Sequence, residues 1–473
     1  MATTNLLTLD RQLALAAKAL DAWRGELAVD DRRDDDDPVA PWPDLSSKAT
    51  IEAIGRSGLA PIPTTPTFLL PEGELITLVA PAHPLDPLAE VRGAMISWCA
   101  HLHVARGVRD ATVVRAGLAR DELESEAYGK KTSLRAMLRA LARPRQAGGV
   151  PEARASATIE DLSPQLLDGV LEEESRRREA AEILGDKARC CSAVDAGATA
   201  EADAFLRATA DEADEALAFG LRAAQRATKH PTWVDVFAVR RAADVAEGWP
   251  AALSGRWFAE LARGTELVAG LDFEVRVDAG RLAPRADHAG LHLAPPTGAW
   301  TFARALFALG AALRLHGRDA KVPFAPHAPP HDRRPWVLGE AFLALASTTV
   351  FHARARGVAR AKAELSARRL ATTRLLERRH LALRVRLAAE LAKGRRAFLE
   401  AFEDLGPKVL GDGPRALAAF LGAPGPLGPA DDAARLRSLS EGDALAARLV
   451  EVFDADWWRN PKAASFIRDR CSR

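Results

Sequence analysis

The side chains of this chain that could bind a metal ion are histidines between residues 288 and 352. His327 and His331 are four residues apart, the separation at which two histidines on a helix ligate one ion. Prolines surround this pair and exclude a helix, because proline removes a backbone donor and clashes with the preceding turn. We therefore expect solvent-exposed loop histidines here, with a relocated metal site as the alternative that His288, His316 and His352 leave open.

The four cysteines form neither a metal motif nor a disulfide framework. Cys99 and Cys471 are isolated, while Cys190 and Cys191 are adjacent. A Cys-x-x-Cys pair or several regularly spaced pairs would be needed for either kind of site. We expect the adjacent pair to be small, partly buried thiols.

The bulk composition describes a globular protein with a large core. The chain has 473 residues, of which 48% are hydrophobic and 27% charged, with 65 basic against 64 acidic side chains. This balance gives no overall field that would attract nucleic acid or a membrane surface. The first fifteen residues lack the pattern of a secretory signal, and no stretch approaches the roughly 18–20 apolar residues that span a bilayer. These features predict a cytoplasmic protein with neither nucleic acid nor membrane as partner.

The elements that must position these side chains are predicted to be mainly helical. Residues 1–85 are expected to hold a helix over about 9–27, an acidic linker with four consecutive aspartates, and a Pro-rich segment with a strand at 75–79. Residues 86–473 are expected to form one helical domain, with functional region 270–345 and a C-terminal helical part 346–473. Helices within it are predicted over 87–106, 122–141, 164–183 and 201–230.

One short region departs from the helical pattern. Residues 272–278 alternate apolar and polar side chains, as do residues 289–293, and Ala279-Gly280 is a turn signal between them. Alternation with a period of two is typical of half-buried strands. The sequence therefore predicts a small antiparallel sheet inserted near 272–293, followed directly by a helix over about 300–316.

The stretch 354–396 is strongly basic. It carries 14 Lys and Arg against only Glu364, Glu377 and Glu390. Such a stretch can attract RNA or an acidic partner, but no aromatic side chains are interleaved with it to stack on bases. We expect a solvated helix face whose arginines pack on the surface.

The helix predicted over 300–316 resembles the zinc-binding helix of M3 family metallopeptidases, the thimet oligopeptidase and oligoendopeptidase F relatives. Active members carry His-Glu-x-Gly-His-Ala-Leu there, and this chain keeps Gly310, with Ala312 and Leu313 after it. Phe307, Ala308 and Ala311 stand where the family has its first histidine, its glutamate and its second histidine.

Two further segments carry the resemblance, which spans about residues 90–473. Residues 336–342, Trp-Val-Leu-Gly-Glu-Ala-Phe, look like the family's downstream helix with its glutamate zinc ligand, here Glu340, 29 positions beyond Ala311. The tail 453–463 resembles the Trp-Trp-Arg-Asn-Pro motif that commonly ends bacterial members. The resemblance implies a two-lobed helical peptidase-like fold around a central cleft.

The resemblance also implies that the zinc chemistry is lost. A hydrolytic zinc site needs three protein ligands and an open position for water, and Phe307 and Ala311 cannot ligate while Ala308 cannot act as a base. Family members stabilise the oxyanion with C-terminal tyrosines, but the expected position is Arg435 and Tyr128 is the chain's one tyrosine. We expect no zinc, and a structural ion pair between Glu340 and either Arg314 or Arg435, because an isolated buried charge is costly.

Three functions remain open at this point. The first is a pseudopeptidase that binds a peptide or protein in an open cleft, with Leu291, His292 and Leu293 offering a strand edge for an extended peptide. The second is an assembly protein that uses its outer surface while Trp300, Phe307 and Trp336 fill the cleft. The third is a surviving zinc-dependent oligopeptidase with a relocated metal.

Overall fold

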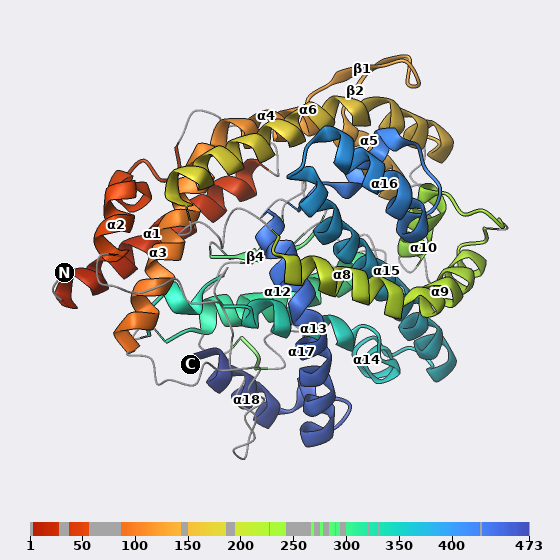
Figure 1. Cartoon of the computed structure of the whole chain (residues 1–473). Helices are drawn as coiled ribbons and strands as arrows, with labels where there is room; N and C mark the ends of the chain where they lie inside the picture. Colours follow the sequence, from red (N-terminus) through yellow and green to blue (C-terminus); the bar gives the residue numbers. More distant parts are fainter. Residues whose placement is uncertain are drawn as a thin grey trace.

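The computed structural model is mainly α-helical, as the sequence predicted, with two small sheets (Figure 1). It describes residues 3–27, 37–55, 87–142, 150–185, 194–226, 228–242, 266–268, 275–277, 283–288, 290–293, 299–319, 322–329, 332–425 and 428–472. The predictions for the linker at 30–36, the strand at 75–79, Cys190, Cys191 and His331 lie outside these residues.

The N-terminal half consists of helices and a short hairpin. In chain order its elements are α1 (Thr3–Leu27), η1 (Pro43–Ser46), α2 (Lys48–Gly55), α3 (Pro87–Gly107), α4 (Arg109–Arg120), β1 (Leu123–Ser125), β2 (Lys130–Thr132), α5 (Leu134–Ala142), α6 (Glu152–Leu184), α8 (Ala196–Ala208), α9 (Ala210–Ala223) and α10 (Trp233–Ala242).

The C-terminal half contains the second sheet and a further set of helices. Its elements are β3 (Val275–Val277), β4 (Arg285–Asp287), β5 (Gly290–Leu293), α12 (Ala299–Gly317), η3 (Ala325–His327), α13 (Arg334–Leu345), α14 (Thr349–Ala355), α15 (Arg360–Leu391), α16 (Arg395–Leu410), η4 (Arg415–Leu417), η5 (Ala418–Gly422), α17 (Pro429–Phe453), η6 (Trp457–Arg459) and α18 (Pro461–Ser472).

The helix predicted over 122–141 is wrong in its first half. Leu123–Ser125 instead pairs antiparallel with Lys130–Thr132, and the helix begins only at Leu134. Gly129 turns the chain between the two strands with a φ of 71°, a left-handed conformation that glycine adopts without steric cost. The helix predicted over 201–230 is likewise two helices, α8 and α9, which meet at Thr209.

The sheet predicted near 272–293 exists but is not purely antiparallel. Its strand order is β3-β5-β4: β5 pairs parallel with β3 and antiparallel with β4. Leu291, His292 and Leu293 therefore lie in the central strand. Leu291 and His292 have partners in both β3 and β4, and Leu293 has one in β3. The prediction that these three residues form a free strand edge is wrong, because their strand already pairs on both sides.

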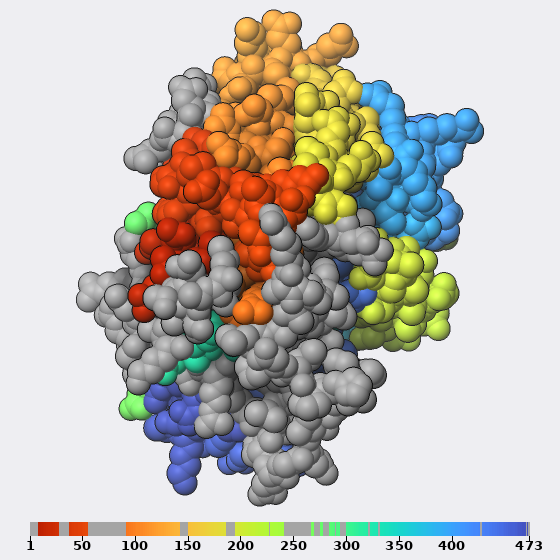
Figure 2. Space-filling view, turned by 60° about the vertical axis from the view of Figure 1, so that its left-hand side comes forward, coloured from red at the N-terminus to blue at the C-terminus, as the bar shows by residue number. Residues whose placement is uncertain are grey.

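The three largest hydrophobic clusters among the described residues hold most of the helices together. One joins α12, α13, α17 and α18; a second joins α1, α2, α3 and η3; a third joins α5 and α6 to α16 and the C-terminal part of α15. In the space-filling view the N-terminal helices, in red and orange, lie against α6 in yellow (Figure 2). The first and third clusters flank the cavity described below.

The N-terminal helix is part of this assembly. Both carboxylate oxygens of Asp10 accept backbone N–H bonds, from Phe324 at 2.6 Å and from Ala325 at 2.8 Å. Further along the helix, Asp21 accepts a bond from His288 at 2.7 Å between Oδ2 and Nδ1. These bonds fix α1 against segments that precede and follow α12.

The tail motif closes the first cluster. Trp457 packs edge-on against Phe342 with ring centroids 5.3 Å apart, and Trp458 packs against Phe351 in the same way. Asn460 then accepts a hydrogen bond from the Lys462 backbone at the start of α18, which packs on α12. The aromatic pair and the capping residue thus fix the last helix against the core.

Helices α12, α13 and α17 approach one another closely at glycines. A Cβ on Gly310 would lie 2.5 Å from the Leu338 carbonyl oxygen, and one on Gly442 would lie 2.4 Å from the Glu340 Cβ. A Cβ on Gly339 would lie 2.8 Å from the Phe307 ring. The glycine kept in the α12 motif therefore has a packing role: it lets the α12 and α13 backbones touch.

Among the described residues, no single helix has the length and apolar composition of a membrane span. Helices α13 and α14 satisfy those criteria only as a pair, and the two meet at an angle of 74°.

We predict that Gly310→Ala lowers the free energy of unfolding by about 1–3 kcal/mol, because the added methyl meets backbone atoms that cannot move aside. Urea unfolding measures the change. Gly117→Ala in α4 is the control, since its nearest contact is a side-chain oxygen at 3.4 Å. That control should be neutral or up to about 1 kcal/mol more stable, because alanine favours helix. Equal stability of the two variants would contradict the close helix approach.

Candidate binding cavity

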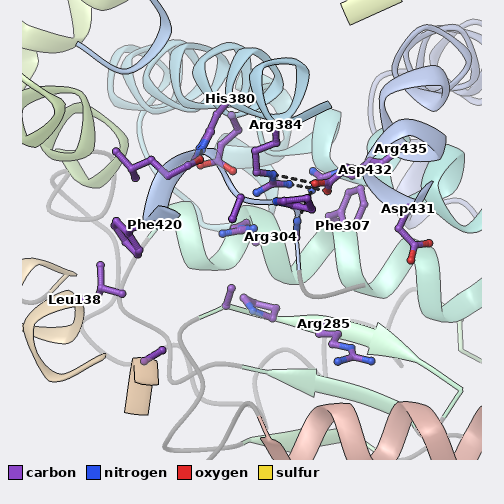
Figure 3. A pocket seen from close by; sticks show the side chains of 18 of the residues that line it. Leu138, Arg285, Arg304, Phe307, His380, Arg384, Phe420, Asp431, Asp432 and Arg435 are labelled. Carbon is purple, nitrogen blue, oxygen red and sulfur yellow. Dashed lines mark hydrogen bonds and ion pairs between the residues drawn. The ribbon is translucent and has the colours of Figure 1, made fainter. Parts of the chain in front are cut away.

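A cavity of about 650 Å³ lies at the centre of the molecule (Figure 3). Its walls come from α1, α4, α5 and α6 on the N-terminal side and from α12, α13, α15 and α17 on the C-terminal side, with β4 and the loop after η5 completing them. Its volume falls within the roughly 300–1,000 Å³ typical of ligand pockets. The space between these helices is therefore large enough for a ligand.

Several positions singled out by sequence line this cavity: Trp300, Phe307, Ala311, Trp336 and Arg435. Phe307 and Ala311, one helical turn apart on α12, face it, whereas Ala308 is buried in the helical core. The Phe307 ring lies parallel to that of Trp336, with an interplanar angle of 7° and centroids 6.3 Å apart. The Arg435 guanidinium lies over the Phe307 ring, 4.3 Å from its centroid. Phe307, Trp336 and Arg435 therefore form an aromatic and cationic wall of the cavity.

The structure buries Glu340 completely and surrounds its carboxylate with arginines. Oε2 accepts from Arg378 at 2.9 Å, and Oε1 accepts from Arg435 at 3.2 Å. Arg374 approaches Oε2 at 3.7 Å and donates to the Glu340 backbone oxygen at 3.3 Å. The predicted ion pair with Arg435 is present, and two arginines of α15 join it. These four side chains are called the Glu340 cluster below.

A second carboxylate balances the cluster. Asp443 on α17 pairs with Arg378 at 2.7 Å and with Arg374 at 2.5 Å. Burial raises the pKa of Glu340, but the charges of Arg435, Arg378 and Arg374 outweigh it and hold that pKa below its usual value. Glu340 is thus a carboxylate that guanidinium groups keep charged.

Arg314, the other partner expected for Glu340, lies elsewhere. Its guanidinium pairs with Asp332 at 2.6 Å and donates to the backbone oxygen of Cys471. Asp332 also pairs with Arg334 at 2.8 Å. This buried pair anchors the C-terminal end of α12 to the start of α13 and to α18, so the Arg314 alternative for Glu340 is wrong.

The residues around Glu340 do not fit a zinc ion. Phe307 and Ala311 have no atom that ligates zinc, and both Glu340 oxygens already accept bonds from guanidinium groups. In the described part of the chain, no group of three His, Cys, Asp or Glu side chains is arranged to hold a metal. Three positive charges beside the carboxylate would also repel a cation.

The prediction of exposed loop histidines is wrong for the candidates that the structure describes. His352 is buried, and His288, His316 and His327 are half-buried and contact other groups of the protein. The prediction for His331 lies outside the described residues. His352 is buried in α14 and contacts the Ala346 carbonyl oxygen at 2.7 Å. His316 contacts the Asp287 oxygen at 2.8 Å, and His327 contacts the Pro323 oxygen at 3.0 Å. Burial lowers the pKa of each of the three, which keeps them neutral near pH 7.

A second polar network lies on the cavity wall beside the Glu340 cluster. Arg240 of α10 pairs with Glu377 of α15 at 3.2 Å and bonds to His380 Nδ1 at the same distance. His380 Nε2 donates to the Leu421 oxygen at 2.7 Å. Burial and the charge of Arg240 lower the pKa of His380 to about 3. Burial raises the pKa of Glu377, but Arg240 and Arg304 lower it to about 2, so the carboxylate is charged beside a neutral histidine.

Arginines therefore dominate the charged lining. Arg384 forms a two-bond pair with Asp432, at 2.8 and 3.1 Å, and Arg304 projects from α12 next to Phe307 (Figure 3). Asp431 also lines the cavity, and burial raises its pKa to about 7. A carboxyl group with that pKa is partly protonated near neutral pH. The net charge of the side chains that line the cavity is therefore more positive than it would be with every carboxyl group ionised.

Sequence reasoning missed the inward role of the basic helix. Arg374 and Arg378 are four residues apart and so lie on one face of α15, which turns toward Glu340. We expected this helix to expose its arginines to water, yet both of these side chains are at most 15% exposed. The available signal was an (i, i+4) arginine pair within an Ala- and Leu-rich helix, combined with a buried glutamate that needed a cation.

Comparison with known proteins gives distant structural similarities only. No family model matches the chain, and no curated protein matches it. A solved structure of Trypanosoma cruzi metallocarboxypeptidase 1 is similar at 12% identity and a TM-score of 0.45, covering 99% of this chain and 89% of that chain. A Colwellia psychrerythraea protein described as a lipoprotein is similar at 11% identity and a TM-score of 0.36, covering 81% and 74%. Similarity at this level assigns neither a family nor a function.

We predict that Glu340→Gln lowers the free energy of unfolding by about 3–5 kcal/mol at pH 7, because Arg435 then loses its carboxylate partner and Arg374 and Arg378 keep only Asp443. A carboxylate with a lowered folded pKa stabilises the protein above its unfolded pKa of 4.5 and stops doing so as the pH falls through the folded value. The difference between variant and wild type should therefore shrink below pH 4.5. Urea unfolding at several pH values measures it.

The control for this prediction is Glu364→Gln on α15, which removes an exposed pair with Arg360 at 2.9 Å. An exposed pair contributes less than about 1 kcal/mol. A Glu340→Gln variant as stable as this control at pH 7 would show that the Glu340 cluster is not a significant source of stability.

Proposed function

We propose that this protein binds a peptide or an extended protein segment in the central cavity and does not cleave it. On this proposal it is a degenerate relative of the M3 metallopeptidases that has lost zinc and kept the binding space. The observation that carries the proposal is a cavity of about 650 Å³ lined by Phe307 and Ala311, the positions at which the resemblance places the histidine ligands.

The geometry favours binding in the cavity over a filled cleft. Trp300, Phe307 and Trp336 were the side chains large enough to fill the space, and all three stand in the cavity wall. Phe307 and Trp336 lie parallel to each other, which keeps both rings along one side. The remaining volume supports a bound partner at this site, and an assembly role for the outer surface has no comparable observation behind it.

The absence of hydrolysis is part of the proposal and has a chemical basis. Peptide hydrolysis by a zinc enzyme needs an activated water, a base and a donor for the oxyanion. Ala308 cannot take a proton, and Arg435 stands where the family has a tyrosine, with its charge committed to Glu340 at 3.2 Å. The chain therefore retains one carboxylate of this machinery, and that carboxylate is structural.

The proposal predicts that the protein retains intact peptides from a mixture. We would incubate it with a library of short random peptides, separate bound from free by gel filtration, and identify the bound fraction by mass spectrometry. Wild-type protein should retain a subset of peptides with both original ends. Peptides with new ends would show cleavage and contradict the non-hydrolytic part of the proposal.

A pair of variants on α4 locates the binding. Thr112 lines the cavity, whereas Val114, two residues further along, is 57% exposed and does not. Thr112→Trp should reduce peptide retention several-fold by occupying the space, and Val114→Trp should leave it unchanged. Equal retention by both variants would place the binding outside the cavity and favour the alternative of an outer-surface assembly protein.

A further inference from the structure

One face of α12 carries an arginine whose role the fold does not explain. Trp300, Arg304, Phe307 and Ala311 all line the cavity, and their spacing of four, three and four residues places them on one side of the helix. Arg304 thus lies one turn before Phe307. Its guanidinium is 5.5 Å from the Trp300 ring centroid, a contact that orients it without neutralising it.

Within the described ranges, the Arg304 guanidinium makes neither a hydrogen bond nor an ion pair with any acid. Its neighbours on the cavity wall are already paired: Arg384 with Asp432 at 2.8 Å and Arg435 with Glu340 at 3.2 Å. The acid whose charge raises the pKa of Arg304 is Glu377. Glu377 is already paired with Arg240 at 3.2 Å. Asp432, Glu340 and Glu377 are therefore each paired with another arginine. Asp431, the remaining acid named above, is partly protonated near neutral pH because burial raises its pKa to about 7.

The groups around Arg304 do not fully compensate its positive charge. Burial lowers its pKa; Glu377 opposes this, and the charges of Arg435, Arg384 and Arg240 add to the lowering. His380 lies on the same wall but is neutral, with its ring nitrogens bonded to Arg240 and Leu421. A desolvated guanidinium among other guanidiniums is costly, and an anion that enters the cavity would offset that cost.

We propose that Arg304 is a recognition site for a carboxylate of the bound peptide. A planar guanidinium matches a carboxylate with two parallel N–H···O bonds, the geometry that selects carboxylates over neutral amides. This inference rests on the proposed function and specifies its ligand: a peptide that places an acidic group beside Trp300. The carboxylate comes either from the C-terminus of the peptide or from an aspartate or glutamate side chain.

Three peptide libraries distinguish these sources. The first has free C-termini and includes acidic residues; the second has amidated C-termini and includes acidic residues; the third has amidated C-termini and replaces Asp and Glu by Asn and Gln. Retention of the first library alone identifies the C-terminal carboxylate. Retention of the first and second identifies an acidic side chain. Both results support the proposal, whereas equal retention of all three overturns it.

Variants of Arg304 test the residue itself. Arg304→Gln should reduce retention of the acidic libraries by about tenfold or more, since a hydrogen bond to a charged group is worth about 1.5–3 kcal/mol. Arg304→Lys keeps the charge without the two-pronged geometry and should lie between wild type and Arg304→Gln. Arg360→Gln, which changes an exposed arginine of α15, is the matched control and should bind like wild type.

The unfolding free energy of Arg304→Gln separates recognition from a structural role. Because Arg304 makes no ion pair with the described residues, the variant should be at least as stable as wild type. Weaker binding together with lost stability would overturn the proposal in favour of a structural arginine. Unchanged binding by Arg304→Gln, with peptides still retained, would also overturn it while leaving the proposed function intact. A wild-type protein that retains nothing from any library would contradict both.

Discussion

A carboxylate that is fully removed from water must be matched by positive charge, and in this protein Glu340 imposes that requirement on three helices at once. Glu340 is on α13, Arg374 and Arg378 are on α15, and Arg435 is on α17. The close approach of α17 at Gly442, beside the Glu340 Cβ, leaves no room for a larger counter-group at that point. Two of the three arginines, Arg374 and Arg435, also line the cavity, so the pairing of Glu340 contributes to that wall.

The pairing of Glu340 with guanidinium groups links the fold to the proposed function. A metal site would present a reactive cation to a substrate, whereas Arg435 presents a guanidinium that is bonded to Glu340 and lies on the face of Phe307. That arrangement supports the wall of the cavity and is available for contact with a ligand, but it generates no nucleophile. On the proposed function, selectivity then depends on cavity shape and on Arg304, which forms no ion pair with an acid among the described residues.

Part of this arrangement could be predicted from the sequence. Most of what could not be predicted is determined by contacts between residues far apart in the chain. The apolar run around Phe307 predicted α12, and the cost of burying a charge predicted an ion pair between Glu340 and either Arg314 or Arg435. The structure has the pair with Arg435. The inward arginines of α15 and the central position of β5 depend on contacts between segments far apart in the chain. Local periodicity specifies that a strand or helix exists, but not which face of a long basic helix turns inward or which strands flank Leu291. The helix expected over 122–141 failed for a local reason, because Gly129 permits a tight turn.

The measurement that tests the account most directly is the zinc content of the full-length protein, purified without chelator, exposed to equimolar zinc and passed over a weak chelating resin. Elemental analysis should find less than about 0.1 equivalent per chain, because a single carboxylate held by arginines cannot supply the three ligands that a catalytic site requires. One tightly held equivalent per chain would contradict the assignment of Phe307 and Ala311 to the ligand positions and of Ala308 to that of the base, and would return peptide hydrolysis to consideration.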